Sequence, residues 1–223
     1  MVWFLSDLHG KMTDGLRKYL ENREKDDLLI LLGDTELYFD GSESNRSFSD
    51  QLLSLDCDIA LIDGNHDNYD FLNSCPVEIW HGGSVHRIGK RMVHLMRGQI
   101  FSIEENSFLA MGGCSSTEKW AKTSLWWSCE QASREELSLA YENLRKRGNQ
   151  VDYILTHKYT NPSHTFRNDS AEEFAEYIRQ NVTYRHWYSG HWHQFERLDA
   201  FHTVVFDELV PLSGQNQKQE QNT

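Results

Sequence analysis

Residues 28–34 read Leu28-Leu29-Ile30-Leu31-Leu32-Gly33-Asp34, five aliphatic residues that run directly into a glycine and an aspartate. An aliphatic run of this length, ended by a polar turn, is typical of a strand that is buried on both faces, as in a parallel sheet. Similar runs occupy residues 2–5, 59–62 and 151–155, and each ends at residues that can bind metal ions. Because the carboxyl ends of parallel strands meet at one edge of an α/β sheet, we expect these polar residues to converge there.

Five polar motifs carry metal-ligand side chains. In chain order they are Ser6-Asp7-Leu8-His9, Gly33-Asp34, Gly64-Asn65-His66-Asp67, Thr156-His157 and Gly190-His191-Trp192-His193. Taken singly, the first is compatible with a surface hydrogen-bonded pair, the second with a simple turn, and His157 with a buried structural histidine. All five together, in this order and with mixed carboxylate and imidazole donors, indicate a dinuclear metal site.

Strand and helix alternate up to residue 63, with helices expected at 12–21 and 48–55. Short strands separated by glycine or polar turns then indicate a meander that forms a second sheet, at 78–81, 85–88, 92–95 and 108–111. The remaining elements are a charged helix at 133–147 stopped by Gly148, a strand at 151–155, a helix at 170–180, and hairpins near 186–190, 195–198 and 203–206. Two sheets packed face to face with helices outside is the simplest arrangement of these elements.

The 223 residues fit a single domain, expected over residues 1–213. We expect a segment at 112–150 to be inserted near the mouth of the active site, and the Gln- and Asn-rich residues 214–223 to form a disordered tail. A net charge of −12 argues against an extended nucleic-acid groove. Neither a membrane span nor a signal peptide is visible, and the four cysteines show no paired short spacing. These features favour a cytoplasmic protein with reduced thiols and no membrane partner.

The motifs resemble the pattern of the calcineurin-like metallophosphoesterase superfamily, which is Asp-x-His, Gly-Asp, Gly-Asn-His-Asp/Glu, His and Gly-His-x-His. The resemblance extends from Val2 to about Phe206. It implies an α/β fold, a four-layer αββα sandwich of two mixed β-sheets flanked by helices. It also implies two divalent metal ions, manganese first, with iron, zinc, nickel or cobalt as alternatives. By this resemblance one ion is held by Asp7, His9, Asp34 and His193, and the other by Asp34, Asn65, His157 and His191, with Asp34 bridging.

The implied activity is hydrolysis of phosphodiesters or small phosphomonoesters by a metal-activated hydroxide. Two cations about 3.5–4 Å apart can share a water, lower its pKa and clamp a phosphoryl group for in-line attack. The resemblance assigns protonation of the leaving group to His66. In the protein-phosphatase branch, Gly-Asp-x-x-Asp-Arg supplies a second aspartate that orients this histidine, whereas this chain has Leu37 there. Asp67 and Glu36 are the remaining candidates for the orienting group, and the chain is closer to small bacterial and phage members without a cap domain.

Substrate contacts are expected from the segment at 112–150, which contains Trp120, Trp126 and Trp127. An indole at the mouth of the site can stack on a nucleobase or aryl leaving group, although these tryptophans are equally compatible with sealing the segment against the sheet. Arg97 is the expected phosphate clamp, because arginine binds phosphate bidentately. Lys119 and Lys122 are weaker candidates, since solvated surface lysines are common. The expected partner is thus a small phosphoester with nucleotide-like features, and protein partners stay open.

Three other functions fit parts of the pattern. A scaffold that retains metal, like the retromer subunit of the superfamily, has no need of His66, which this chain keeps. A Ser/Thr protein phosphatase is disfavoured by Leu37. A nuclease of this superfamily carries an added DNA-binding cap, for which this chain has neither the residues nor the basic charge.

Overall fold

The computed structural model describes residues 1–116, 125–159 and 169–212. One sheet contains β1 (Val2–Leu5), β2 (Leu28–Leu32), β3 (Asp58–Ile62), β4 (Val77–Trp80), β5 (Gly83–Arg87), β6 (Met92–Leu95) and β13 (Val210–Pro211). The other contains β7 (Ile100–Ile103), β8 (Asn106–Met111), β9 (Tyr153–Thr156), β10 (His186–Ser189), β11 (Glu196–Arg197) and β12 (His202–Val204). The described helices are α1 (Asp14–Asn22), α2 (Glu43–Leu53), α3 (Tyr69–Ser74), α4 (Arg134–Lys146), α5 (Ser170–Asn181) and the short 3₁₀ helix η2 (Ser128–Glu130).

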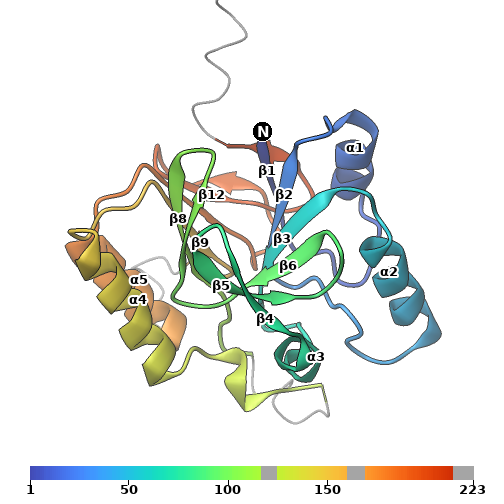
Figure 1. Ribbon diagram of the computed structural model, residues 1–223, viewed down its shortest axis with the longest axis horizontal. Coiled ribbons are helices and arrows are strands. Elements are labelled where there is room, and N and C mark those ends of the chain that lie inside the picture. Colours follow the sequence, from blue (N-terminus) through green and yellow to red (C-terminus); the bar gives the residue numbers. More distant parts are fainter. Residues whose placement is uncertain (117–124, 160–168, 213–223) are drawn as a thin grey trace, which may run out of the picture.

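The two sheets pack face to face between two layers of helices (Figure 1). The first sheet has the order β13-β1-β2-β3-β6-β5-β4, and the second has the order β11-β12-β10-β9-β8-β7. Helices α1, α2 and α3 cover the outer face of the first sheet, and α4 and α5 cover that of the second. The predicted four-layer αββα sandwich of two mixed sheets is therefore confirmed.

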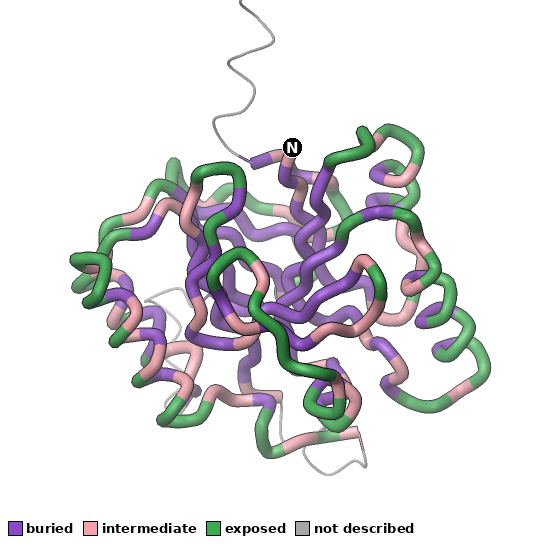
Figure 2. The backbone as a smooth tube through the Cα atoms, in the orientation of Figure 1, coloured by how far each residue is buried: buried purple, intermediate pink, exposed green. Residues whose placement is uncertain are grey.

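Strand β2 shows why both faces of its sheet must be covered. Successive side chains of a strand point to opposite faces, so a strand buried on both faces must be apolar throughout. Leu28, Ile30 and Leu32 pack in the core between the sheets, while Leu29 and Leu31 pack against the helices. Figure 2 shows the result, with buried strands in the centre and exposed positions concentrated on the outer helices and loops. No helix among the described residues is long and apolar enough to cross a bilayer.

The prediction of a meander that forms the second sheet was wrong for β4, β5 and β6. Strand β6 pairs parallel with β3, with Met92 opposite Ile59, and β5 and β4 then extend the first sheet. Of the expected short strands, only the one at 108–111 lies in the second sheet, as part of β8. Hydrophobic patterning indicates that a strand is buried but not which neighbour it pairs with, and this accounts for the error.

The segment at 112–150 contributes a structural layer as well as residues near the site. Ser133 and Glu136 form a capping box at the start of α4, and Gly148 follows the helix with a φ of +64°. The buried face of α4 packs with α5 against β8 and β9. Residues 134–146 of the expected insertion therefore form part of the outer helix layer.

Arg97, the expected phosphate clamp, does not line the cavity that contains His66, and its guanidinium is buried among other partners. Its guanidinium donates to the Asp63 carboxylate at 2.8 and 2.5 Å and to the Tyr69 hydroxyl at 2.8 Å. It also donates to the backbone carbonyls of Cys129 and Glu130, each at 3.0 Å. Burial opposes ionisation of Asp63, but the charge of Arg97 outweighs it and holds the pKa of Asp63 below its ordinary value. Arg97 thus joins β3, α3 and η2 in one buried network.

We expect Arg97→Met to lower the free energy of unfolding by about 3–5 kcal/mol, because it leaves the buried Asp63 carboxylate without its partner. Urea unfolding followed by circular dichroism measures this. The matched control is Arg91→Met, since the partly exposed pair of Arg91 with Asp58 is expected to contribute at most about 1 kcal/mol. An Arg97 variant with unchanged stability and a raised KM would restore the phosphate-clamp role.

Candidate metal centre

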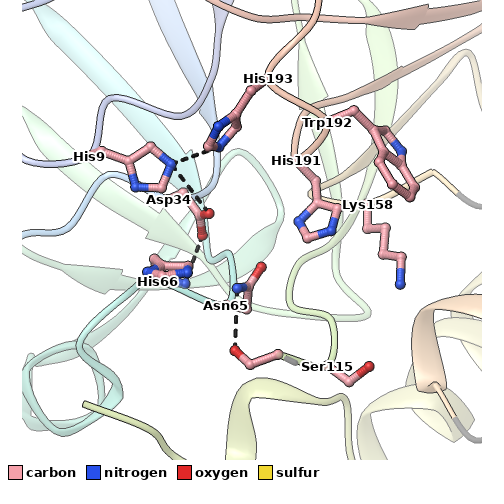
Figure 3. Close-up of a pocket in the computed structure, with 10 residues that line it drawn as sticks. His9, Asp34, Asn65, His66, Ser115, Lys158, His191, Trp192 and His193 are labelled. Atoms are coloured by element: carbon pink, nitrogen blue, oxygen red, sulfur yellow. Dashed lines mark hydrogen bonds and ion pairs between the residues drawn. The ribbon is translucent and has the colours of Figure 1, made fainter. Parts of the chain in front are cut away.

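The predicted ligand residues lie in loops that follow five parallel-paired strands. Asp7 follows β1, Asp34 follows β2, and Asn65 follows β3, while His157 and His191 follow β9 and β10 of the other sheet. Figure 3 shows side chains from the two sheets converging on one cavity. The structure therefore brings together the residues named from the sequence as metal ligands, which are Asp7, His9, Asp34, Asn65, His157, His191 and His193.

Left-handed backbone conformations recur in these loops. Three pairs of residues two positions apart have φ between 47° and 75°, namely Asp7 and His9, Asp34 and Glu36, and His191 and His193. Side chains with a Cβ rarely adopt this region, and each such residue costs on the order of 1–3 kcal/mol. Strain of this kind persists only where the surroundings hold it, and it concentrates at functional sites.

Two glycines permit the loops to approach one another. A Cβ on Gly64 would collide with the Asp34 carboxylate, and a Cβ on Gly190 would collide with the Ser6 hydroxyl. Only glycine leaves this space open. The glycines in the Gly-Asn-His-Asp and Gly-His-x-His motifs are thus explained by close packing around the ligands.

Asp67 connects the loop after β2 to the loop after β3. Its carboxylate accepts hydrogen bonds from the backbone N–H groups of Asp34, Thr35, Glu36 and Gly64, at 2.7 to 3.0 Å. These four bonds fix the backbone that carries Asp34. Asp67 is therefore engaged in loop structure and not in orienting His66.

The first group of ligand atoms comes from Asp7, His9, Asp34 and His193, which lie within 4.8 Å of one another. His9 Nδ1 lies 2.8 Å from a carboxylate oxygen of Glu36, which can only accept when ionised, so Nε2 of His9 is left for a ligand role. That Nε2 lies 2.9 Å from His193 Nε2 and 3.8 Å from Asp34 Oδ2. Asp7 Oδ1 is buried and accepts no hydrogen bond from the described residues. An unsatisfied carboxylate oxygen beside two imidazole nitrogens fits a cation.

The second group faces the other oxygen of Asp34. His157 Nδ1 donates to the Leu32 carbonyl at 2.7 Å, which leaves its Nε2 only 3.3 Å from Asp34 Oδ1 and 3.3 Å from His191 Nδ1. Asn65 completes the group. Its Nδ2 donates to the Ser116 hydroxyl at 3.3 Å, so its amide oxygen is directed towards the ligands. The two oxygens of Asp34 thus face different groups, as a bridging ligand requires.

Burial and neighbouring charges shift the pKa values of three residues in this centre. Burial works against the ionised carboxylate, yet the neighbouring His157 lowers the pKa of Asp34 below its ordinary value. Burial likewise opposes protonation of His157, but Asp34 raises the pKa of His157 to about 10. Burial and the charge of His157 lower the pKa of His191 to about 3. In the absence of a cation, a proton on His157 balances Asp34, and a divalent cation would take its place and release that proton.

Glu36 is the carboxylate nearest to His66 among the described ion pairs. Its Oε1 lies 3.6 Å from His66 Nδ1 and 2.8 Å from His9 Nδ1. Leu37 is buried in the core on the helix side of the first sheet, so its position does not face the site. The sequence left Asp67 and Glu36 open as the orienting group, and the distances favour Glu36.

A cavity of about 350 Å³ adjoins the two ligand groups. Besides ligands and His66, its wall contains Ser115, Ser116, Lys158 and Trp192. The side chain of Lys158 donates to Asp169 at 2.8 Å, and Trp192 is 46% exposed, with its indole N–H bonded to the Tyr159 carbonyl at 3.0 Å. These four residues were not predicted to line the site, although Lys158 and Trp192 are adjacent in the sequence to predicted ligands.

The tryptophans named from the sequence lie differently. Trp127 packs near Phe39 and Tyr69, with ring centroids 5.7 and 6.3 Å away, which agrees with the alternative that it seals the segment. Trp126 is 37% exposed, and neither of these two tryptophans lines the cavity. Lys119, Trp120 and Lys122 lie outside the described residues.

A comparison with protein-family models matches residues 1–195 to the calcineurin-like phosphoesterases. No curated protein matches the chain. The family match covers the five motifs up to His193 and most of both sheets, and it implies metal-dependent hydrolysis of phosphoesters. The fold, the paired ligand groups and this match together establish that the chain belongs to the calcineurin-like phosphoesterase family.

Proposed function

We propose that this protein is a phosphoesterase with two metal ions that hydrolyses small phosphodiesters or phosphomonoesters with a ring-bearing leaving group. The observation that carries the proposal is the division of the ligand atoms into two groups that face different oxygens of Asp34, with His66 on the wall of the same cavity. His66 also favours an enzyme over a metal-retaining scaffold, since a scaffold has no use for a proton donor beside the ligands.

Asp7, His9, Asp34 and His193 would hold one cation, and Asp34, Asn65, His157 and His191 would hold the other. When bound, two divalent cations supply Lewis acidity to the phosphoryl oxygens and a hydrolytic water with a pKa near neutrality. Mixed imidazole and carboxylate donors suit borderline metals. Manganese as the first metal and a cytoplasmic location both stay predictions.

His66 is proposed to protonate the departing oxygen, and Glu36 to orient its imidazole. An accepting carboxylate near Nδ1 favours the tautomer with the proton on Nδ1, so protonation for acid catalysis takes place at Nε2. Because Glu36 also lies 2.8 Å from His9 Nδ1, one carboxylate positions both a ligand and the acid. In the protein phosphatases the orienting carboxylate stands at the position of Leu37. In this chain the proposed orienting carboxylate is Glu36, one residue earlier.

Trp192 is proposed to recognise the ring of the leaving group. Its indole is anchored through its N–H to Tyr159 and still has a substantial exposed surface at the cavity. A fixed aromatic face binds a base or aryl ring at little cost in conformational entropy. We therefore assign the stacking role that was expected of Trp126 and Trp127 to Trp192, which lies between His191 and His193 in the sequence.

We expect Asp34→Asn to lose both metal ions, because the substitution removes the charge that the two cations share. Inductively coupled plasma mass spectrometry of the purified protein gives the metal content per chain. Asp70→Asn, an exposed aspartate of α3, is the control and should keep two ions. Two tightly bound ions in the Asp34 variant, together with full activity, would contradict the bridging assignment.

We expect His66→Ala to keep its metal ions and to lower kcat for alkyl and ribose esters by about 10²- to 10⁴-fold. The loss should be smaller for nitrophenyl esters, whose leaving groups need little protonation. At saturating metal, which offsets weaker binding through His9, Glu36→Gln should reproduce part of this pattern, and adding it to His66→Ala should cause little further loss, because the remaining effect of Glu36 acts through His66.

The control for this series is Glu43→Gln, an exposed residue at the start of α2. Equal losses on all leaving groups would contradict acid catalysis by His66. Fully additive losses of kcat in the double variant would show that Glu36 does not act through His66.

We expect Trp192→Ala to raise KM for a nucleotide or aryl phosphoester and to spare an alkyl phosphoester. Stacking contributes about 1–3 kcal/mol, which corresponds to roughly 5- to 150-fold in KM. Trp192→Phe should restore part of the affinity, and Trp126→Ala is the control because Trp126 lies off the cavity. Metal content must be unchanged, since Trp192 stands between His191 and His193.

The substrate class follows from a panel of aryl diester, aryl monoester, cyclic nucleotide and phosphopeptide, each assayed with separate metals. We expect the phosphopeptide to be the poorest substrate, because Leu37 departs from the protein-phosphatase motif. Efficient phosphopeptide turnover would overturn the assignment to small substrates.

A further inference from the structure

Cys114 lies among the ligands of the second group, although no motif of the sequence points to it. It is fully buried, and its Sγ lies 3.1 Å from Asn65 Oδ1 and 3.7 Å from His191 Nδ1. With His157 and His191 it forms a group whose ligand atoms all lie within 4.8 Å of one another. Cys57, the other buried cysteine among the described residues, packs in the core on the helix side of the first sheet.

The spacing of these atoms is that of ligands around one ion. With Cys114 the ion would have five protein ligands, and metal bonds of about 2.0–2.1 Å to nitrogen and 2.3 Å to sulfur at angles of about 90–120° place neighbouring ligand atoms roughly 2.8–3.8 Å apart. The observed separations are 3.1 and 3.7 Å from Sγ, and 3.3 Å between His157 Nε2 and His191 Nδ1. All three separations lie within this range, and together they involve four ligand atoms.

The backbone holds Cys114 in this place. Strand β8 runs parallel to β9, with Met111 opposite Thr156, so the residues after both strands arrive at the same edge. Gly113 donates its N–H to the Asp63 carbonyl at 2.7 Å, which connects this segment to the loop that carries Asn65. The thiol is thus positioned by the same sheet edge that positions His157.

We propose that Cys114 is a ligand of the metal ion held by Asn65, His157 and His191, and that it binds through sulfur after its thiol proton passes to solvent. The inference rests on the proposed metal centre and deepens it. The two ions would then have unlike surroundings, since the first group offers only nitrogen and oxygen. A sulfur ligand favours zinc, iron or cobalt over manganese at the second position. The competing arrangement is a neutral thiol that only donates a hydrogen bond to Asn65.

Cobalt substitution of the full chain separates these arrangements without an activity assay. A protein with two cobalt ions should show the near-ultraviolet charge-transfer absorption of a thiolate bound to cobalt. Cys114→Ser should lose this band and keep its fold, as judged by circular dichroism, while Cys57→Ser should keep the band. Zinc affinity of Cys114→Ser, measured by chelator competition, should fall by at least about 10- to 100-fold, the loss that outer partners of a metal site already cause.

A second measurement needs no variant. X-ray absorption at the zinc edge of the wild-type protein loaded with two zinc ions should include a sulfur scatterer at about 2.3 Å, at an average of about half a sulfur per zinc because only one of the two ions binds Cys114. Two bound cobalt ions without the thiolate band, or a band that persists in Cys114→Ser, would overturn the role of Cys114 and leave the two-metal proposal intact. Failure of the wild-type protein to bind cobalt or zinc would overturn both.

Discussion

The Asp34 carboxylate is buried at the point where the two sheets meet, and burial opposes its charge. That charge is retained because histidines approach it from both sides, His157 towards one oxygen and His9 towards the other. The backbone N–H of His66 also donates to it at 2.7 Å. A change at this carboxylate therefore affects both ligand groups and the backbone beside His66. The site behaves as one electrostatic unit, in which removing one partner leaves the others buried and uncompensated.

Residues proposed as metal ligands also connect the two sheets. His157 of the second sheet donates to the Leu32 carbonyl of the first, and the N–H of His191 donates to Asp7 at 3.0 Å. These bonds fix the tautomer of His157 and the distance between the ligand groups. Strained loops at the junction would hold the proposed ligands preorganised, which would reduce the reorganisation that metal binding requires.

The residues proposed to contact the substrate lie on one side of this junction. Trp192, Lys158 and the two serines line the cavity from the second sheet and from the segment after β8, whereas His66 and Glu36 come from the first sheet. The proposed reacting groups and the proposed recognition groups therefore belong to different elements. Cys114, from the segment after β8, would further distinguish the second metal position from the first. Under these proposals, variation after β8 and β10 would change the substrate or the metal without altering the acid or the bridging carboxylate.

The sequence by itself determined the strands that end at ligands, because a continuous aliphatic run followed by Gly-Asp allows few other structures. Its motifs also predicted the seven expected ligand residues and His66 as a set, and the structure places these residues near one another. Only the tertiary structure decided the partners of β6, the burial of Arg97 beside Asp63, and the proximity of Cys114 and Trp192 to the ligands. Local patterning records which face of an element is apolar, but pairing between strands and contacts across 30 or more positions depend on how the whole chain packs.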